Sequence, residues 1–87
     1  MNFQILFSPK SKKQIDKFPL QIKEKIQEAS LEIQQDPYHL GTIKIEGYEN
    51  IRRKRIGRYR ILYTTDKIQK EILVIKVEKR DEHTYKL

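Results

Sequence analysis

The chain has 87 residues, of which 37% are hydrophobic and 36% charged, and its 19 basic and 12 acidic side chains give a net charge of +7. A chain of this length supports one modest core, so we expect a single domain over residues 1–87. The absence of cysteine excludes disulfides and thiolate metal sites, and it suits a reducing cytoplasm. The apolar run Ile5-Leu6-Phe7 is too short for a signal peptide or a membrane span, so we expect a soluble cytoplasmic protein with no membrane partner.

The N-terminal half is predicted to hold one strand and two helices. Phe3, Ile5 and Phe7 alternate with Asn2, Gln4 and Ser8, as in a strand with one buried face. Ser8-Pro9 is typical of an N-cap followed by proline at the first helical position, which predicts a short basic helix that ends near Lys17. Phe18-Pro19 breaks that helix, and a second helix is expected from about Leu20 to Gln35.

The second predicted helix has apolar side chains on two sides. One stripe follows the spacing of a buried helical face, and it comprises Ile22, Ile26, Ala29 and Ile33. Leu20 and Leu31 lie on the opposite side. These two leucines either pack against the first helix or form an exposed stripe for a protein partner.

From Thr42 onward the hydrophobic period becomes that of strands. Four strands separated by turn-compatible residues are expected, at Thr42–Glu46, Asn50–Ile56, Tyr59–Thr65 and Glu71–Lys79. Short connections between consecutive strands produce antiparallel hairpins. The order of strand, helix hairpin and antiparallel β-meander predicts an α+β fold with the helices packed on one face of the sheet.

The excess positive charge is concentrated in residues 51–60. This window holds no acidic residue and six of the basic ones, namely Arg52, Arg53, Lys54, Arg55, Arg58 and Arg60. The planar guanidinium of arginine suits phosphate recognition and stacking, and such a patch is typical of a protein with a polyanionic partner. The alternative is an ordinary solvated face.

Strand alternation divides these basic side chains between two faces. Arg53 and Arg55 share one face, whereas Arg52 and Lys54 share the other. In an antiparallel meander, four guanidiniums can converge on one exposed face, those of Arg53, Arg55, Arg60 and Arg80. Together with Tyr85 near the end of the sequence, they suit an RNA phosphate and an adjacent base that stacks.

Other kinds of site are excluded by their missing motifs. The sequence has no Asp, Glu and His cluster with metal-ligand spacing and no glycine-rich phosphate loop. It also lacks a serine or cysteine nucleophile with a base nearby. We therefore expect no metal and no cofactor.

The basic stretch resembles the RelE branch of the RelE/ParE toxin superfamily. The resemblance rests on Lys44-Ile45-Glu46-Gly47, on Arg53-Lys54-Arg55-Ile56-Gly57-Arg58-Tyr59-Arg60-Ile61-Leu62-Tyr63, and on Lys79-Arg80 with Tyr85. It implies a toxin that cuts messenger RNA in the ribosomal A site and is neutralised by a RelB-like antitoxin. The implied catalytic residues are Arg53, Arg55, Arg60, Arg80 and Tyr85. Further RNA contacts are expected from Arg52, Lys54, Arg58, Lys79 and His83.

The chain departs from the superfamily pattern at three places. Lys54 occupies a position where the pattern has an apolar, inward residue. Glu46 lies where some relatives have a basic residue. The sequence stops at Leu87, which leaves little of the C-terminal helix that relatives have.

The acid and base of the implied reaction stay open. Metal-free cleavage uses the neighbouring 2′-OH as nucleophile, and it requires stabilisation of a phosphorane and the movement of two protons. Arginine is a poor base, so Tyr85 is either the base or a stacking platform, and His83 competes for the same role. Arg80 protonates the leaving oxygen or neutralises it, and Arg60 has a structural alternative as a salt-bridge partner. Because no strong acid–base pair is present, we expect the ribosome to orient the 2′-OH.

Two other functions fit the same fold. One is the gyrase-directed activity of the ParE branch, which is not catalytic, and the other is an inactive RNA-binding module. The ParE branch generally lacks the convergent basic residues and the terminal tyrosine, so their presence in this sequence favours RNA cleavage.

Overall fold

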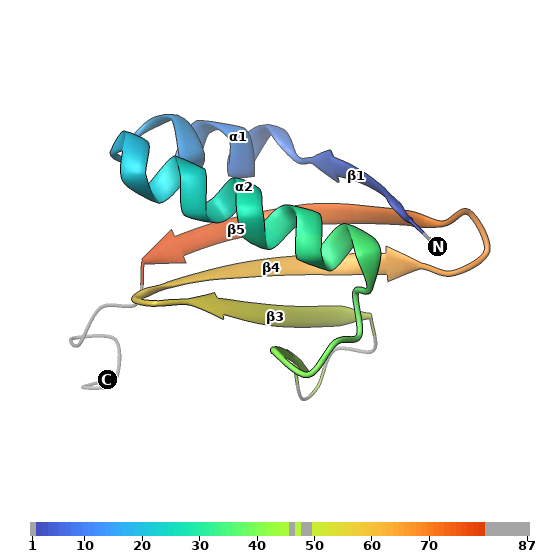
Figure 1. Cartoon of the computed structure of the whole chain (residues 1–87). Coiled ribbons are helices and arrows are strands. Elements are labelled where there is room, and N and C mark those ends of the chain that lie inside the picture. The colour runs from blue at the N-terminus through green and yellow to red at the C-terminus, as the bar shows by residue number, and fades with distance from the viewer. Residues whose placement is uncertain (1, 46, 48–49, 80–87) are drawn as a thin grey trace.

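The computed structural model describes residues 2–45, 47 and 50–79. These residues form a five-stranded sheet with two helices on one of its faces (Figure 1). In chain order the elements are β1 (Gln4–Phe7), α1 (Pro9–Asp16), α2 (Leu20–Gln35), β2 (Thr42–Lys44), β3 (Ile51–Ile56), β4 (Tyr59–Asp66) and β5 (Glu71–Lys79). The α+β class and the helix hairpin on one sheet face are confirmed.

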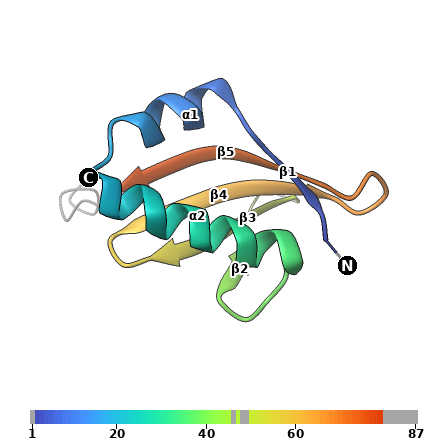
Figure 2. The ribbon, with the colours of Figure 1, turned by 45° about the horizontal axis from the view of Figure 1, so that its top comes forward.

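The sheet is mixed, because its first strand runs parallel to its last. The strand order is β1-β5-β4-β3-β2, and β2 to β5 form the predicted antiparallel meander. Gln4 pairs with Glu71 and Phe7 with Val74 in the parallel ladder between β1 and β5. Figure 2 shows β1 and β5 side by side, although nearly the whole chain separates them in sequence.

The helices begin and end where local chemistry requires it. The Ser8 side chain accepts a hydrogen bond from Ser11 N at 3.1 Å, which caps α1, and Pro9 occupies the first turn, where no amide partner is needed. Pro19 precedes α2, and Asp36 follows its last residue. Neither helix in the described part of the chain has the length and apolar character needed to cross a bilayer.

One stripe of α2 fills the core. Ile26, Ala29 and Ile33 are buried against inward side chains of the sheet, which are Ile61, Tyr63, Ile72, Val74 and Val77. Leu20 and Leu31 are 70% and 54% exposed, so the interpretation that they pack against α1 is wrong. The α1 helix packs against β5 instead and leaves that side of α2 open.

Tyr63 fixes the segment after α2 to the sheet. Its side chain is fully buried, and its hydroxyl donates a hydrogen bond of 2.6 Å to the carbonyl oxygen of Pro37. Burial raises the pKa of Tyr63 above the ordinary value of 10.0, so this phenol is a neutral donor. The bond satisfies a buried carbonyl and holds the approach to β2 in place.

Candidate functional site

Three of the predicted arginines lie together on the sheet face away from the helices, which we call the open face. Arg55 pairs directly with Arg60 across β3 and β4, and Arg53 pairs with Leu62. Directly opposite residues project to the same side of a sheet, with Cβ atoms about 5 Å apart. The inward neighbour Ile61 is buried under α2, which places the arginines on the opposite side.

The strand register arranges the open face in four rows that run across the sheet. The first row is Glu78, Arg60 and Arg55, and the second is Lys76, Leu62, Arg53 and Ile43. The third row is Leu6, Leu73, Thr64 and Ile51, and the fourth is Gln4, Glu71 and Asp66. The face therefore changes from basic to apolar to acidic along the strands.

Arg60 is already engaged by a carboxylate in its own row. Its Nε and Nη2 donate to Glu78 Oε1 at 2.7 and 2.6 Å, and Lys76 Nζ lies 2.9 Å from Glu78 Oε2. Burial raises the pKa of Glu78, but hydrogen bonds and charge from Lys76 and Arg60 outweigh it and hold the pKa below 4.5. Glu78 is therefore ionised at neutral pH, and Arg60 is its salt-bridge partner in this structure.

Sequence reasoning missed Glu78. Alternation along β5, with Val77 buried, places Glu78 outward, and the hairpin register then sets it opposite Arg60. The alternation was readable from the sequence, whereas the register depends on a bulge between Leu62 and Tyr63.

Lys54 lies on the helix-covered face and is only 7% exposed. Its Nζ is 3.2 Å from His39 Nε2 and 3.7 Å from Glu32 Oε2. The structure does not bring Lys54 to the open face, because strand alternation turns it inward and His39 and Glu32 provide polar partners there. This placement agrees with the inward position noted in the superfamily pattern, and it gives no support to an RNA contact.

Arg52 shares that face with Lys54. Its Nη2 donates to Thr42 Oγ1 at 2.9 Å, and its guanidinium lies 5.2 Å from the ring centre of Tyr38. These contacts tie β3 to the segment that leads into β2. Arg52 is therefore a structural contact and is not part of the arginine group on the open face.

The remaining predicted residues lie at one end of the sheet or outside the described residues. Arg58 is exposed in the turn between β3 and β4, where Gly57 has a φ of 58° that glycine adopts without steric cost. Lys79 is exposed at the end of β5. Arg80, His83, Tyr85 and Glu46 lie outside the described residues. Within the described ranges, no three His, Asp or Glu side chains are grouped as metal ligands.

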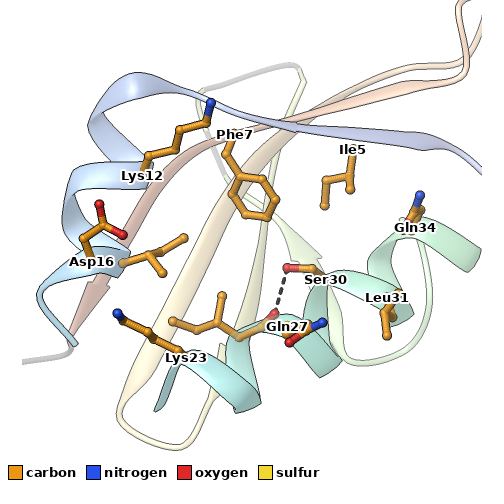
Figure 3. Close-up of a pocket in the computed structure, with 11 residues that line it drawn as sticks. Ile5, Phe7, Lys12, Asp16, Lys23, Gln27, Ser30, Leu31 and Gln34 are labelled. Carbon is orange, nitrogen blue, oxygen red and sulfur yellow. Dashed lines mark hydrogen bonds between the residues drawn. The ribbon is translucent and has the colours of Figure 1, made fainter. Parts of the chain in front are cut away.

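A groove of about 460 Å³ lies on the helix side, between α1, α2 and β1 (Figure 3). Its lining includes the apolar side chains Ile5, Phe7, Ile15, Ile26 and Leu31. Lys12 and Asp16 reach it from α1, whereas Lys23 and Gln27 reach it from α2. The groove therefore combines an apolar lining with two lysines and one aspartate.

Comparison with known proteins finds a matching family model and several similar solved structures. A family model described as the ParE toxin of the type II toxin–antitoxin system parDE matches residues 5–84. No curated protein sequence matches the chain.

Solved structures of RelE proteins are similar along nearly the whole chain. The toxin–antitoxin complex RelBE2 from Mycobacterium tuberculosis has 20% identity and a TM-score of 0.81, covering 92% of this chain and 100% of that one. The archaeal RelE–RelB complex from Pyrococcus horikoshii OT3 has 22% identity and a TM-score of 0.80, with coverage of 94% and 99%. The RelB–RelE complex from Methanococcus jannaschii has 26% identity and a TM-score of 0.74, with coverage of 94% and 98%.

Proposed function

The chain belongs to the ParE toxin family of type II toxin–antitoxin systems, within the RelE/ParE superfamily, and on that premise we propose that it is a RelE-type toxin. In this proposal it is a metal-independent, ribosome-dependent endoribonuclease that cuts messenger RNA in the A site by attack of the 2′-OH. The observation that supports it most is the direct pairing of Arg55 with Arg60 on the open face, with Arg53 in the next row.

The pairing of two arginines costs stability, so it calls for a functional reason. Like charges directly opposite on two strands repel each other. Glu78 contributes one negative charge beside Arg60, which offsets one of the two positive charges of the Arg55–Arg60 pair. A phosphorane provides the missing negative charge. The guanidiniums of Arg53, Arg55 and Arg60 stabilise it with their positive charge and their N–H donors.

Proton transfer is assigned to residues that follow β5 in the sequence. Tyr85 or His83 takes the proton of the 2′-OH, and Arg80 neutralises or protonates the leaving oxygen. Tyr63 is not a candidate base, because its hydroxyl is buried and already donates to Pro37. The ribosome is proposed to orient the 2′-OH and to complete the site.

A second candidate function is the non-catalytic activity of a gyrase-directed ParE toxin. The observation that favours it is Glu78, which places a carboxylate on Arg60 where a cleavage site needs open positive charge. The description of the matching family model points the same way. An inactive RNA-binding module of the same fold is the third reading.

The proposed protein partner is a RelB-like antitoxin. Several similar toxins have been solved as complexes with their RelB antitoxins. The groove between α1, α2 and β1, whose lining includes the exposed Leu31, offers an apolar surface for such a chain. Lys12 and Lys23 at the groove suit an antitoxin segment that is amphipathic and acidic.

Expression of the toxin with and without a small acidic antitoxin, followed by mapping of transcript 5′ ends, tests this proposal. New 5′ ends within translated codons are expected when the antitoxin is absent. Growth arrest with intact transcripts and damaged DNA would instead establish the gyrase-directed function. Single-turnover cleavage should be much faster on programmed ribosomes than on naked message, and equal rates would disprove the part assigned to the ribosome.

Arg60→Ala provides the site-directed test. If Arg60 contacts the scissile phosphate, its loss removes roughly 2–4 kcal/mol of transition-state stabilisation, a rate decrease of about 30- to 1000-fold. The fold should survive, because Glu78 keeps Lys76 as a partner. Lys25→Ala on the exposed side of α2 is the matched control, and it should cleave at the wild-type rate.

A further inference from the structure

The acidic end of the open face contains a hollow of about 450 Å³ that the proposed chemistry does not use. It is lined by residues of the third and fourth rows, among them Leu6, Leu73, Thr64, Asp66 and Glu71, and by Asn50 just before β3. Leu6 and Leu73 are exposed large hydrophobic side chains. The hollow thus has apolar walls and a rim of amide, hydroxyl and carboxylate groups.

The two carboxylates of the hollow differ in availability. Asp66 Oδ1 already accepts hydrogen bonds from the amides of Ile68 and Gln69, both at 3.0 Å, which close the turn between β4 and β5. Glu71 on β5 pairs directly with Asp66 on β4, and its side chain is partly exposed at the hollow. Asp66 has only its second oxygen, Oδ2, outside these turn bonds, so Glu71 is the better placed of the two carboxylates to accept hydrogen bonds from a ligand.

The position of the hollow relative to the arginines decides which part of an RNA chain can enter it. Thr64 follows Arg60 by four positions along β4, a span of about 13 Å on the same face. Phosphates are attracted to the arginine rows and repelled by Asp66 and Glu71. A strand anchored by its phosphates at the basic rows can therefore present only a base to the acidic end.

From this arrangement we propose that the hollow binds the base of a nucleotide next to the cleaved one, and that Glu71 selects bases that carry an amino group. The inference deepens the proposed function and rests on it. Leu6 and Leu73 provide apolar contact for the flat ring, and Glu71 accepts a hydrogen bond from the exocyclic amino group of cytosine or adenine. Uracil has the acceptor O4 in place of the amino group of cytosine, so the carboxylate repels that atom and uracil binds more weakly.

Binding of short RNA that cannot be cleaved tests the proposal without relying on catalysis. The probes are 2′-O-methyl pentanucleotides that differ only by cytosine or uracil at each position in turn, and the readout is the ratio of their dissociation constants. The wild-type protein should prefer cytosine by roughly tenfold at one position. Glu71→Gln should reduce that ratio to about one, while the matched control Glu24→Gln on α2 keeps it.

The ratio separates recognition from a general change in charge. Removal of any acid raises RNA affinity for all sequences, whereas only loss of base recognition changes the ratio between cytosine and uracil. An unchanged ratio in Glu71→Gln would overturn the proposal. If that variant also loses affinity for the antitoxin, the occupant of the hollow is a protein segment and not a base.

Cleavage mapping distinguishes failure of this inference from failure of the proposed function. If transcripts are cut and Glu71→Gln leaves the base preference beside the cut unchanged, the hollow plays no part while the endoribonuclease proposal stands. If no transcript is cut but the pentanucleotides show the Glu71-dependent ratio, the hollow is a base site on a protein that binds RNA without cutting it.

Discussion

Replacement of Glu78 by glutamine should strengthen RNA binding to the open face. Both contacts of the Arg60 guanidinium, from Nε and Nη2, converge on one oxygen of Glu78, and Lys76 holds the other oxygen. A phosphate that approaches Arg60 competes for the same edge of the guanidinium. Glu78→Gln keeps the shape of the side chain and removes the charge that a phosphate must displace.

The magnitude follows from the exposure of the pair. The side chains of Arg60 and Glu78 are 24% and 23% exposed, so the contact is partly shielded from water and lies near the upper end of the range for surface pairs, about 1 kcal/mol. This free energy corresponds to about a fivefold change in an equilibrium constant. We therefore expect RNA affinity to rise about fivefold and the free energy of unfolding to fall by about 1 kcal/mol.

Fluorescence anisotropy with a labelled, non-cleavable oligoribonucleotide measures the first effect, and urea unfolding measures the second. The gain in affinity should be larger at 50 mM than at 200 mM salt, because screening weakens the charges that Glu78→Gln unmasks. Glu24→Gln, an exposed change on α2, serves as the control. Weaker RNA binding by Glu78→Gln would refute the reasoning, since Glu78 would then orient Arg60 for the phosphate.

Three further predictions concern the roles that the structure gives to other side chains. Tyr63→Phe leaves the buried Pro37 carbonyl without its 2.6 Å donor, so the free energy of unfolding measured in urea should fall by about 1–3 kcal/mol. Lys54→Met should change RNA affinity by no more than about twofold and should leave the free energy of unfolding unchanged or higher, because Lys54 is buried on the other face. Arg55→Met should weaken RNA binding about tenfold. Equal losses of RNA affinity in the two variants would place Lys54 in the RNA site. Because the pKa of Glu78 is held below 4.5, its stabilising contribution is present above that pH and is lost as the pH falls through the lowered pKa. The difference in stability between wild type and Glu78→Gln should therefore shrink on acidification below pH 4.5, and a difference that grows on acidification would contradict this assignment.

Local patterns determined the elements and the division of the arginines between faces. The second helix spans Leu20–Gln35 as expected, because the prolines on either side and the helical stripe are all local signals. The four meander strands also lie where alternation predicts them, within one or two residues at their ends. Alternation alone placed Arg53 and Arg55 on one face, and that placement is confirmed.

Other features depend on which segments meet in space. The parallel pairing of β1 with β5 joins residues at opposite ends of the chain, and no local pattern identifies that partner. The exposure of Leu20 and Leu31 follows from the position of α1 over β5.

The chemistry of the site shows the same division. The sequence identifies Arg60 as an outward cation, but the bulge in the β4–β5 register decides that Glu78 lies opposite it and neutralises it. In the same way, alternation along β3 sets the inward direction of Lys54. The burial of its ammonium group is tolerated because His39, from a loop, and Glu32, from a helix, lie close to it. Side-chain direction is a property of a strand by itself, while the charge that a side chain meets is fixed only when separate strands and helices come together.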